Sequence, residues 1–274
     1  MPLDSFPFLA EKQIEQLLAS VADAGRRLLS SQPSRALQDE PAMRRCFELA
    51  CAGTMQHLSA CLGTFSPDIP VFQAGLTPDQ LPETAGPYWI CDPVDGAIQY
   101  LAGLPMWTTT LTLMVGQVPC LAIVHDACMG RTYHAVRGGG AACNGAAIRC
   151  NTEPVLALST VGTSFPNLPP RPRAEMHDFL LMLGQVIPAV LAQRWIGSAT
   201  LSLALVASGK LDAYWECGRH LVDWLPGVLI AREAGALVSP LAGNVLGQAG
   251  SGLIAAPASV HGHLLDMSRV LRQR

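Results

Sequence analysis

Two aspartates lie three positions apart where an apolar run ends, in the segment WICDPVDGAIQY at residues 89–100. Between Asp92 and Asp95, Pro93 fixes the backbone φ angle and removes an amide donor, so the chain turns and both carboxylates can face one point. Two carboxylates with a backbone carbonyl between them offer the oxygen ligands that hard cations such as Mg²⁺ prefer. The spacing therefore predicts a metal site at the end of a buried strand.

The residues after this pair suggest that a phosphate group binds next to the metal. A helix is expected to begin at Asp95-Gly96, so the free amide groups of Gly96 and Ala97 would face a phosphate oxygen at its N-terminus. The alternative is an Asx turn followed by an ordinary helix cap, because Asp, Pro and Gly are the usual turn residues. From this pentapeptide alone, both interpretations stay open.

A third carboxylate, Asp223, follows far downstream. A strand is predicted at Asp212–Glu216 and a helix from about Leu225 to Ala234, so Asp223 falls after a short loop and just ahead of the helix. A carboxylate in that position can complete a metal site and orient a nucleophilic water.

With these residues in place, the chain resembles the inositol monophosphatase family of Mg²⁺-dependent phosphatases. The resemblance covers most of the chain from about Tyr88 onward and is weaker before it. It rests on four stretches, WICDPVDG, RGGGAACNGAAIR, GSATLSLALVASGKLDAYWE and DWLPGVLIAREAGA. It implies Mg²⁺-dependent hydrolysis of a small phosphomonoester, such as inositol monophosphate or a sugar phosphate.

The resemblance also implies a role for each matching position. The metal ligands and catalytic groups would be Asp92, Asp95 and Asp223, with the Val94 carbonyl as a further metal ligand. The substrate would be contacted by Gly96 and Ala97 at its phosphate, by Gly197, Ser198 and Ala199, and by Glu216 at a polyol hydroxyl. Ordinary alternatives exist for two of them, since Ser198 is a good helix N-cap and most Glu side chains at strand ends are simply solvated.

The sequence departs from the family pattern on one side of this site. The family carries a Glu-Glu pair before the D-P-x-D-G strand, and the corresponding residues here are Ala74 and Gly75, with Asp79 and Glu83 as the nearest carboxylates. The family threonine after D-P-x-D-G is Ala97, and Leu225 and Pro226 replace small residues beside Asp223. Loss of a carboxylate ligand lowers metal affinity, and loss of a water-orienting hydroxyl lowers the rate. A second hypothesis is therefore a weakened or inactive member that acts as a binding or regulatory protein.

For the fold, the resemblance implies a layered αβαβα sandwich of mixed α+β and α/β character. An N-terminal subdomain at residues 1–152 would carry an antiparallel sheet and a C-terminal α/β subdomain would span 153–274, with the site between them. Periodicity predicts helices at Ile14–Leu29 and Met43–Leu62, a Pro/Gly-rich loop over residues 63–87, a strand at Tyr88–Cys91 and a meander after Met106. Strands are then expected at Val155–Val161, Leu191–Ile196 and Asp212–Glu216, helices at Ala174–Gln185 and Ala199–Ser208, and a last strand-helix pair from Leu253.

A homodimer is expected through the meander, as is common in the family. Its runs WTTTLTLMV and CLAIV offer more apolar surface than one face of a sheet needs, although helices of the same chain covering both faces would explain this equally.

Composition narrows the classes of partner. The 274 residues carry a formal net charge of −3 and no basic stripe, which excludes the electrostatic footprint of a nucleic-acid binder. The sequence contains no uninterrupted run of 18 apolar residues, so no membrane helix is predicted, and the first residues do not form a signal-peptide pattern. Nine cysteines without CxxC spacing indicate reduced, mostly buried thiols. We therefore expect a cytoplasmic protein without nucleic-acid or membrane partners.

Overall fold

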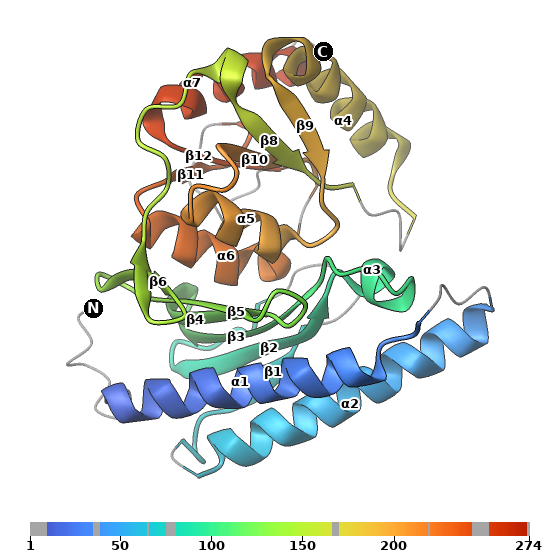
Figure 1. Ribbon diagram of the computed structural model, residues 1–274, viewed down its shortest axis with the longest axis vertical. Helices are drawn as coiled ribbons and strands as arrows, with labels where there is room; N and C mark the ends of the chain where they lie inside the picture. Colours follow the sequence, from blue (N-terminus) through green and yellow to red (C-terminus); the bar gives the residue numbers. More distant parts are fainter. Residues whose placement is uncertain are drawn as a thin grey trace.

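The computed structural model describes residues 10–34, 39–64, 66–74, 81–165, 170–218, 220–242 and 252–272 as five alternating layers of helices and sheets (Figure 1). The outermost layer on one side consists of two long helices, α1 (Glu11–Ser31) and α2 (Glu40–Leu62). Asp39 caps α2 by accepting a hydrogen bond from the Ala42 amide at 3.1 Å.

A seven-stranded sheet forms the second layer, in the order β1-β2-β3-β4-β5-β6-β7. β1 pairs with β2 in parallel and all other neighbours are antiparallel. A short helix, α3 (Ala97–Leu101), follows β2 directly. The strands are β1 (Val71–Gln73), β2 (Pro87–Asp95), β3 (Thr108–Val115), β4 (Val118–Asp126), β5 (Arg131–Val136), β6 (Gly140–Cys143) and β7 (Ala146–Ile148).

Two helices of the second half, α5 (Ala199–Ala207) and α6 (Leu221–Glu233), form the middle layer, and a five-stranded sheet covers them. Its order is β11-β12-β10-β8-β9, with β8 parallel to both of its neighbours. The last layer contains α4 (Arg173–Val186) and α7 (Ala258–Met267). The strands are β8 (Thr160–Thr163), β9 (Ala192–Trp195), β10 (Ala213–Glu216), β11 (Leu237–Ser239) and β12 (Leu253–Ala256), and short 3₁₀ turns lie at Leu156–Leu158, Ile187–Ala189 and Ser268–Arg272.

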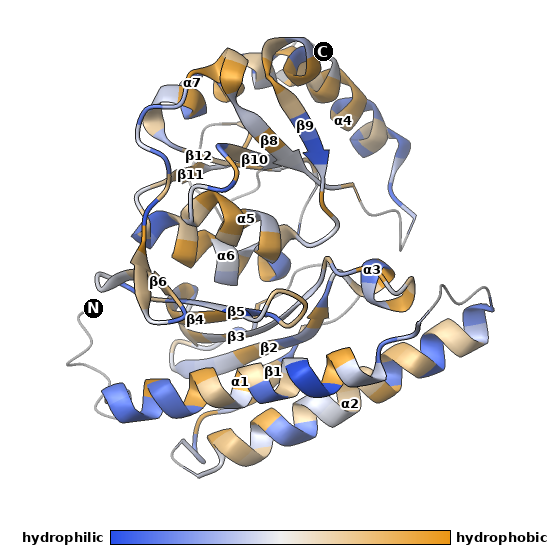
Figure 2. Cartoon of the chain, in the orientation of Figure 1, coloured by the Kyte–Doolittle hydropathy of each residue, from blue (hydrophilic) through white to orange (hydrophobic). Residues whose placement is uncertain are grey.

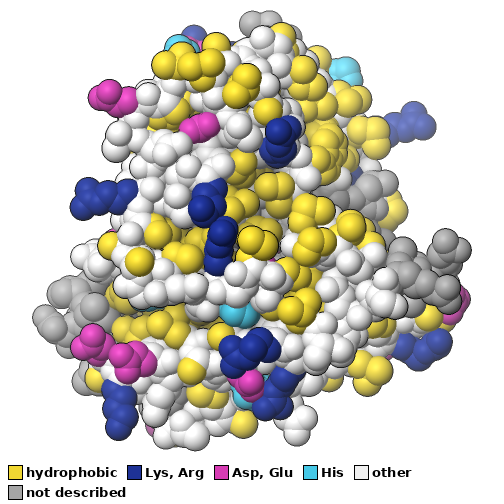
Figure 3. Space-filling view, in the orientation of Figure 1, with side chains coloured by type: hydrophobic (Ala, Val, Ile, Leu, Met, Phe, Trp, Pro, Cys, Tyr) yellow, Lys and Arg dark blue, Asp and Glu magenta, His cyan; other side chains and the backbone are white. Residues whose placement is uncertain are grey.

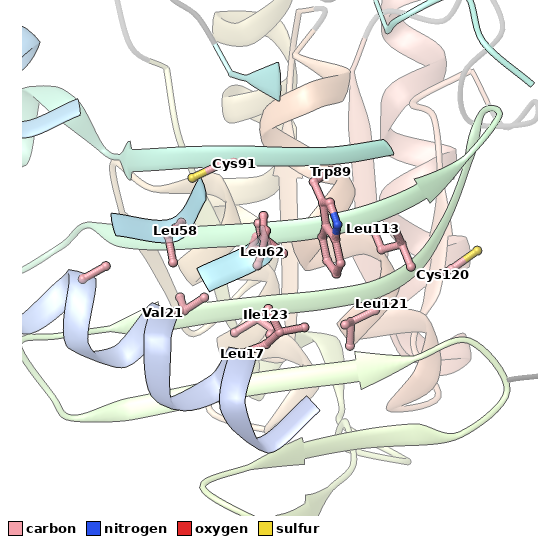
Figure 4. Close-up of a cluster of buried hydrophobic side chains, with 12 residues drawn as sticks. Leu17, Val21, Leu58, Leu62, Trp89, Cys91, Leu113, Cys120, Leu121 and Ile123 are labelled. Atoms are coloured by element: carbon pink, nitrogen blue, oxygen red, sulfur yellow. The ribbon is translucent and has the colours of Figure 1, made fainter. Parts of the chain in front are cut away.

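The layers are held by separate apolar cores. Figure 4 shows the first, in which Leu17 and Val21 of α1 and Leu58 and Leu62 of α2 meet Trp89 and its neighbours on the sheet. The middle helices are apolar on nearly every side, whereas α1 turns a polar side to solvent (Figure 2). A helix that is apolar all round belongs in an interior, and α5 and α6 are accordingly buried between the two sheets.

This architecture confirms the predicted αβαβα sandwich. The helix predictions agree with α1, α2, α4 and α5 to within about three residues, an ordinary boundary error. The strand predicted at Val155–Val161 is wrong at its start, because Leu156–Leu158 form a 3₁₀ turn and β8 begins at Thr160. The loop prediction for residues 63–87 missed β1, a three-residue strand too short to leave a periodic pattern.

The apolar runs of the meander do not by themselves support a dimer there, and the dimer stays a prediction. Leu111, Leu113, Leu121 and Ile123 are fully buried under α1 and α2, and Ala122 and Val124 are fully buried under the middle helices. Helices of the same chain therefore cover both faces, which explains the unbroken apolar runs.

Two further expectations can be compared with the described residues. All nine cysteines are free thiols, as predicted. Within the described part of the chain, no helix combines the length and the apolar character needed to cross a membrane.

Candidate active site between the two sheets

Strand β2 presents Asp92 on the face of the first sheet that looks toward the middle layer. Successive side chains of a strand point to opposite faces. Trp89 and Cys91 pack beneath α1 and α2, whereas Tyr88 and Ile90 pack against α6. Asp92 continues the second series, so its carboxylate turns toward α6.

The chain then turns sharply, and the register of β2 against β3 shifts between Asp92 and Asp95. The Val94 amide donates to Asp92 Oδ1 at 3.0 Å, and the Thr109 hydroxyl donates to the Pro93 carbonyl at 2.9 Å. The Asx turn that the sequence offered as an alternative thus forms, and it leaves the second carboxylate at the same end of the strand.

Asp95 is held by the first residues of α5. Its Oδ2 accepts hydrogen bonds from Ser198 Oγ at 2.6 Å, from the Thr200 amide at 3.0 Å and from the Thr200 hydroxyl. Asp95 is only 8% exposed. A carboxylate from the first half of the chain is therefore fixed at the N-terminus of a helix from the second half, where the helix dipole also favours negative charge.

Three buried hydroxyl side chains, Thr108, Ser198 and Thr200, surround this carboxylate, and we call them the hydroxyl cluster. Thr108 Oγ1 lies 3.4 Å from Ser198 Oγ and 3.2 Å from Thr200 Oγ1. Ser198 also caps α5, as predicted, by accepting from the Leu201 amide at 3.0 Å. Sequence reasoning missed Thr108 and Thr200, although hydroxyl residues inside an apolar strand and an apolar helix must find partners when they are buried.

The electrostatics of Asp92 and Asp95 follow from their burial and proximity. Burial raises the pKa of Asp92 above that of an ordinary carboxyl, and the neighbouring charge of Asp95 raises it further. Burial likewise raises the pKa of Asp95, opposed by the hydrogen bonds from Ser198 and Thr200. Two carboxylates that repel each other in a dry site are stabilised by a cation between them.

The two residues predicted at the phosphate follow this pair directly. Gly96 is in the left-handed region with φ of 91°, and a Cβ there would lie 2.8 Å from the Met106 carbonyl, so the turn requires glycine. Ala97 is the first residue of α3, which has only five residues. Their contact with a phosphate stays a prediction.

The predicted substrate residues of α5 lie beside α3. Gly197 precedes the Ser198 cap, and a Cβ at Gly197 would overlap the side-chain amide of Gln99. Ala199 is buried as the first residue of α5. The structure thus brings Gly197 and Ser198 to the end of β2, and it adds Gln99, which the sequence analysis did not single out.

Asp223 has a different environment. It lies within the first turn of α6, since the helix begins at Leu221 and not near Leu225 as predicted. Its side chain is 38% exposed, and its Oδ2 lies 3.9 Å from Nδ1 of His220. Burial lowers the pKa of His220 to about 4, with the nearby Arg171 charge as a second cause, so this histidine is neutral at pH 7.

The position aligned with the missing glutamate is apolar and packed. The Ala74 amide donates to the Cys91 carbonyl at 2.7 Å, which continues the parallel register and places Ala74 beside Asp92. Ala74 packs against a cluster that contains Ile90 and Leu225 of α6. The alanine at the position of the family glutamate and the leucine that replaces a small family residue therefore belong to one apolar region. Gly75 and Asp79 lie outside the described residues.

Glu216 ends β10 and is held by neighbouring side chains of the second half. Its Oε2 accepts from the Tyr214 hydroxyl at 2.7 Å and from Trp224 Nε1 at 2.9 Å, and Arg171 Nη2 lies 3.5 Å from Oε1. Burial raises the pKa of Glu216 to about 7, although these hydrogen bonds and Arg171 oppose the shift. The alternative of an ordinary solvated glutamate is wrong, because the residue is 2% exposed.

The donors at the end of β2 fit one hard cation. Asp92 and Asp95 supply carboxylate oxygens, and the intervening Val94 carbonyl is of the same oxygen type. Among the described residues, however, no three His, Cys, Asp or Glu side chains are grouped so that they could hold a metal ion. Asp223 is thus not gathered with the other two aspartates into a three-carboxylate site, and the three-aspartate ligand set stays a prediction.

Comparisons with known proteins find one family and several similar proteins. Residues 70–271 match the model of the inositol monophosphatase family. An inositol-1-monophosphatase of Mesorhizobium japonicum is 35% identical over 157 residues, which cover 57% of this chain and 58% of that protein. A Nus factor SuhB of Haemophilus influenzae is 34% identical over 182 residues, which cover 66% of this chain and 67% of that protein.

Solved structures share the whole architecture. The Thermotoga maritima IMPase has a TM-score of 0.78 at 20% identity and covers 96% of this chain and 98% of its own. Mycobacterium tuberculosis SuhB has a TM-score of 0.74 at 26% identity and covers 92% of this chain and 94% of its own.

Proposed function

Because the chain belongs to the inositol monophosphatase family, we propose that it is a Mg²⁺-dependent phosphatase of small phosphomonoesters with a weakened metal site. The observation that supports this most is the carboxylate pair at the end of β2, in which Asp95 is fixed by Ser198 and Thr200 beside Asp92. Since the matched segments span only 58% of the M. japonicum protein and 62% of a Mycobacterium leprae relative, activity and substrate are proposals for this chain.

In this proposal Asp92, Asp95 and the Val94 carbonyl hold the cation, and Asp223 acts on the leaving-group side. Mg²⁺ bound there would activate a water and neutralise charge on phosphoryl oxygens. Gly96, Ala97 and Gly197 would orient the phosphate at the junction of β2 and α5. The substrate we propose is inositol monophosphate or a sugar phosphate.

Calorimetric titration with Mg²⁺ tests the metal site, and phosphate release from inositol 1-phosphate and a panel of sugar phosphates tests the reaction. We expect binding in the millimolar range and slow release, both abolished in Asp92→Asn. Folded protein that neither binds Mg²⁺ nor releases phosphate at millimolar Mg²⁺ would exclude the enzyme.

The apolar cluster that contains Leu225 and borders Ala74 favours the second candidate, an inactive member that acts as a binding or regulatory protein. A relative at 34% identity is named a Nus factor, which states a role for that protein. In this case a calorimetric titration with inositol 1-phosphate would show binding, and no phosphate would be released.

We also propose that the chain forms a homodimer, and the exposed apolar surface that supports it lies outside the meander. Among the described residues, seven of fourteen exposed large apolar side chains lie between residues 155 and 195, and apolar side chains gather over α4 and β9 in Figure 3. β9 is the edge strand of its sheet, and edges that carry exposed apolar side chains favour association. The patch consists of Val155, Leu158, Met176, Leu180, Ile187, Leu191 and Trp195. Light scattering that gives a monomer mass at micromolar concentration would exclude the dimer.

A further inference from the structure

The surroundings of Glu216 suggest that it positions neighbouring elements of the fold. Its two carboxylate oxygens are engaged on different sides, Oε2 by Tyr214 and Trp224 and Oε1 by Arg171. At 2% exposure, Oε2 can accept a substrate hydroxyl only if Tyr214 or Trp224 moves away, while Oε1 faces the Arg171 guanidinium at 3.5 Å. Each oxygen instead connects β10 to another element of the second half.

Arg171 is built into this arrangement from the segment that precedes α4. Its side chain is 5% exposed. Nη1 donates to the Cys217 carbonyl at 3.3 Å and to Glu175 Oε2 at 3.4 Å, and the guanidinium lies 5.1 Å from the centre of the Phe165 ring. Hydrogen bonds, an ion pair and an aromatic face together fix the group in one orientation.

Gly218 allows the chain to pass over this guanidinium. Its φ of 105° is left-handed, and a Cβ would overlap Arg171 Nη1 and approach His220 Nε2 to 3.0 Å. Gly218 therefore lies closely against Arg171, and α6 begins three residues later.

The link from Glu216 to the proposed active site is Trp224. Its indole Nε1 donates to Glu216 at 2.9 Å, and Trp224 is buried in the first turn of α6, next to Asp223. The His220 ring packs edge-on against the same indole at 6.1 Å. A residue that fixes the Trp224 side chain thereby fixes the turn that carries Asp223.

We propose that Arg171 and Glu216 form a buried positioning pair that holds the first turn of α6, and with it Asp223. This inference concerns the site in the proposed function and rests on it for its kinetic consequences. Its structural part, the coupling of the pair to α6, can be measured in a protein without activity.

The kinetic experiment compares Arg171→Met, Glu216→Gln and the double variant on two substrates. Inositol 1-phosphate carries hydroxyls around its phosphate, and p-nitrophenyl phosphate carries none. We expect each single variant to lower kcat/KM about equally on both substrates. The double variant should recover at least threefold relative to the weaker single variant, because removing one partner strands a buried charge and removing both does not. A tenfold loss confined to inositol 1-phosphate in Glu216→Gln would overturn the proposal.

Hydrogen exchange supplies the readout that does not depend on activity. We expect amides of residues 221–225 to exchange at least tenfold faster in Arg171→Met and in Glu216→Gln, while those of α5 stay unchanged. Arg173→Met is the matched control, because Arg173 is exposed two residues away. Folded variants with unchanged exchange in the first turn of α6 would overturn the proposal, whether or not the protein hydrolyses phosphate. If the wild-type protein hydrolyses neither substrate and the variants still exchange faster, the phosphatase proposal is rejected and the proposal of a positioning pair stands.

Discussion

The surroundings of the carboxylates differ between the two sides of the candidate site, the Asp95 side and the Asp223 side. On the Asp95 side, the carboxylate is 8% exposed and accepts hydrogen bonds from Ser198 and from both donors of Thr200. On the Asp223 side, the carboxylate is 38% exposed and lies 3.9 Å from His220, and two residues further along α6 Leu225 belongs to an apolar cluster against which Ala74 packs. One side is a closed polar network that joins the two halves of the chain, whereas near the other lies an apolar cluster that contains Leu225 and borders Ala74.

The difference indicates which site residues a sequence can lose without losing the fold. Removing a partner from a buried hydrogen-bonded network leaves other donors unsatisfied, which costs free energy of folding. Replacing a carboxylate that would contact a metal by alanine removes no such partner. It can even add apolar burial, since Ala74 packs against the cluster that contains Leu225. The Asp95 side is therefore retained by folding as well as by function.

Truncation of each aspartate tests this comparison with the largest expected effect. In the absence of Mg²⁺, we expect Asp95→Ala to lower the free energy of unfolding by about 3 kcal/mol, because the Thr200 amide and the hydroxyl cluster lose their acceptor. Asp223→Ala should cost about 0.5 kcal/mol, the value of an acidic side chain in the first turn of a helix. Urea unfolding measures both.

Asp95→Asn is the matched control, since it keeps one oxygen acceptor and should fall between the two alanine variants. Equal losses for Asp95→Ala and Asp223→Ala would contradict the distinction between the two sides.

The same contrast explains how much the sequence predicted. The fold and the position of Asp92, Asp95, Gly197 and Ser198 followed from motifs, because a motif records local turns and the elements on which they lie. The hydroxyl cluster did not follow, since the contacts of Thr108 with Thr200 join residues 92 positions apart. The engagement of Glu216 by Arg171 was missed for the same reason, and a residue's burial cannot be read from its own side-chain type.

Restoring the family residues at Ala74 and Ala97 should strengthen Mg²⁺ binding, and the change in free energy should be smaller than the loss of stability in Asp95→Ala. We expect Ala74→Glu combined with Ala97→Thr to tighten Mg²⁺ binding about tenfold, or about 1.4 kcal/mol, by adding a carboxylate ligand and a hydroxyl that holds the bound water. Adding Leu225→Ala should increase the gain by making room for the glutamate. Calorimetry measures the affinity.

Ala74→Gln in the same background has nearly the same size without the charge. Binding no tighter in the glutamate variant than in this control would show that Ala74 does not mark the ligand position, and the two sides would then differ for a reason other than the lost glutamate.

The smallest expected effect concerns the contact between Gly197 and Gln99, which joins the two halves of the chain on the Asp95 side. A Cβ at Gly197 would overlap the end of the Gln99 side chain, which is flexible and can rotate away. We expect Gly197→Ala to cost about 1 kcal/mol, the typical lower value for inserting a methyl group into a packed contact. Gln99→Ala should remove most of that cost, so the double variant would be more stable than the sum of the single changes predicts. Urea midpoints of the four proteins give the coupling. Additive losses would show that Gln99 does not press on Gly197, and that the Asp95 side is joined by the hydroxyl cluster and not by this contact.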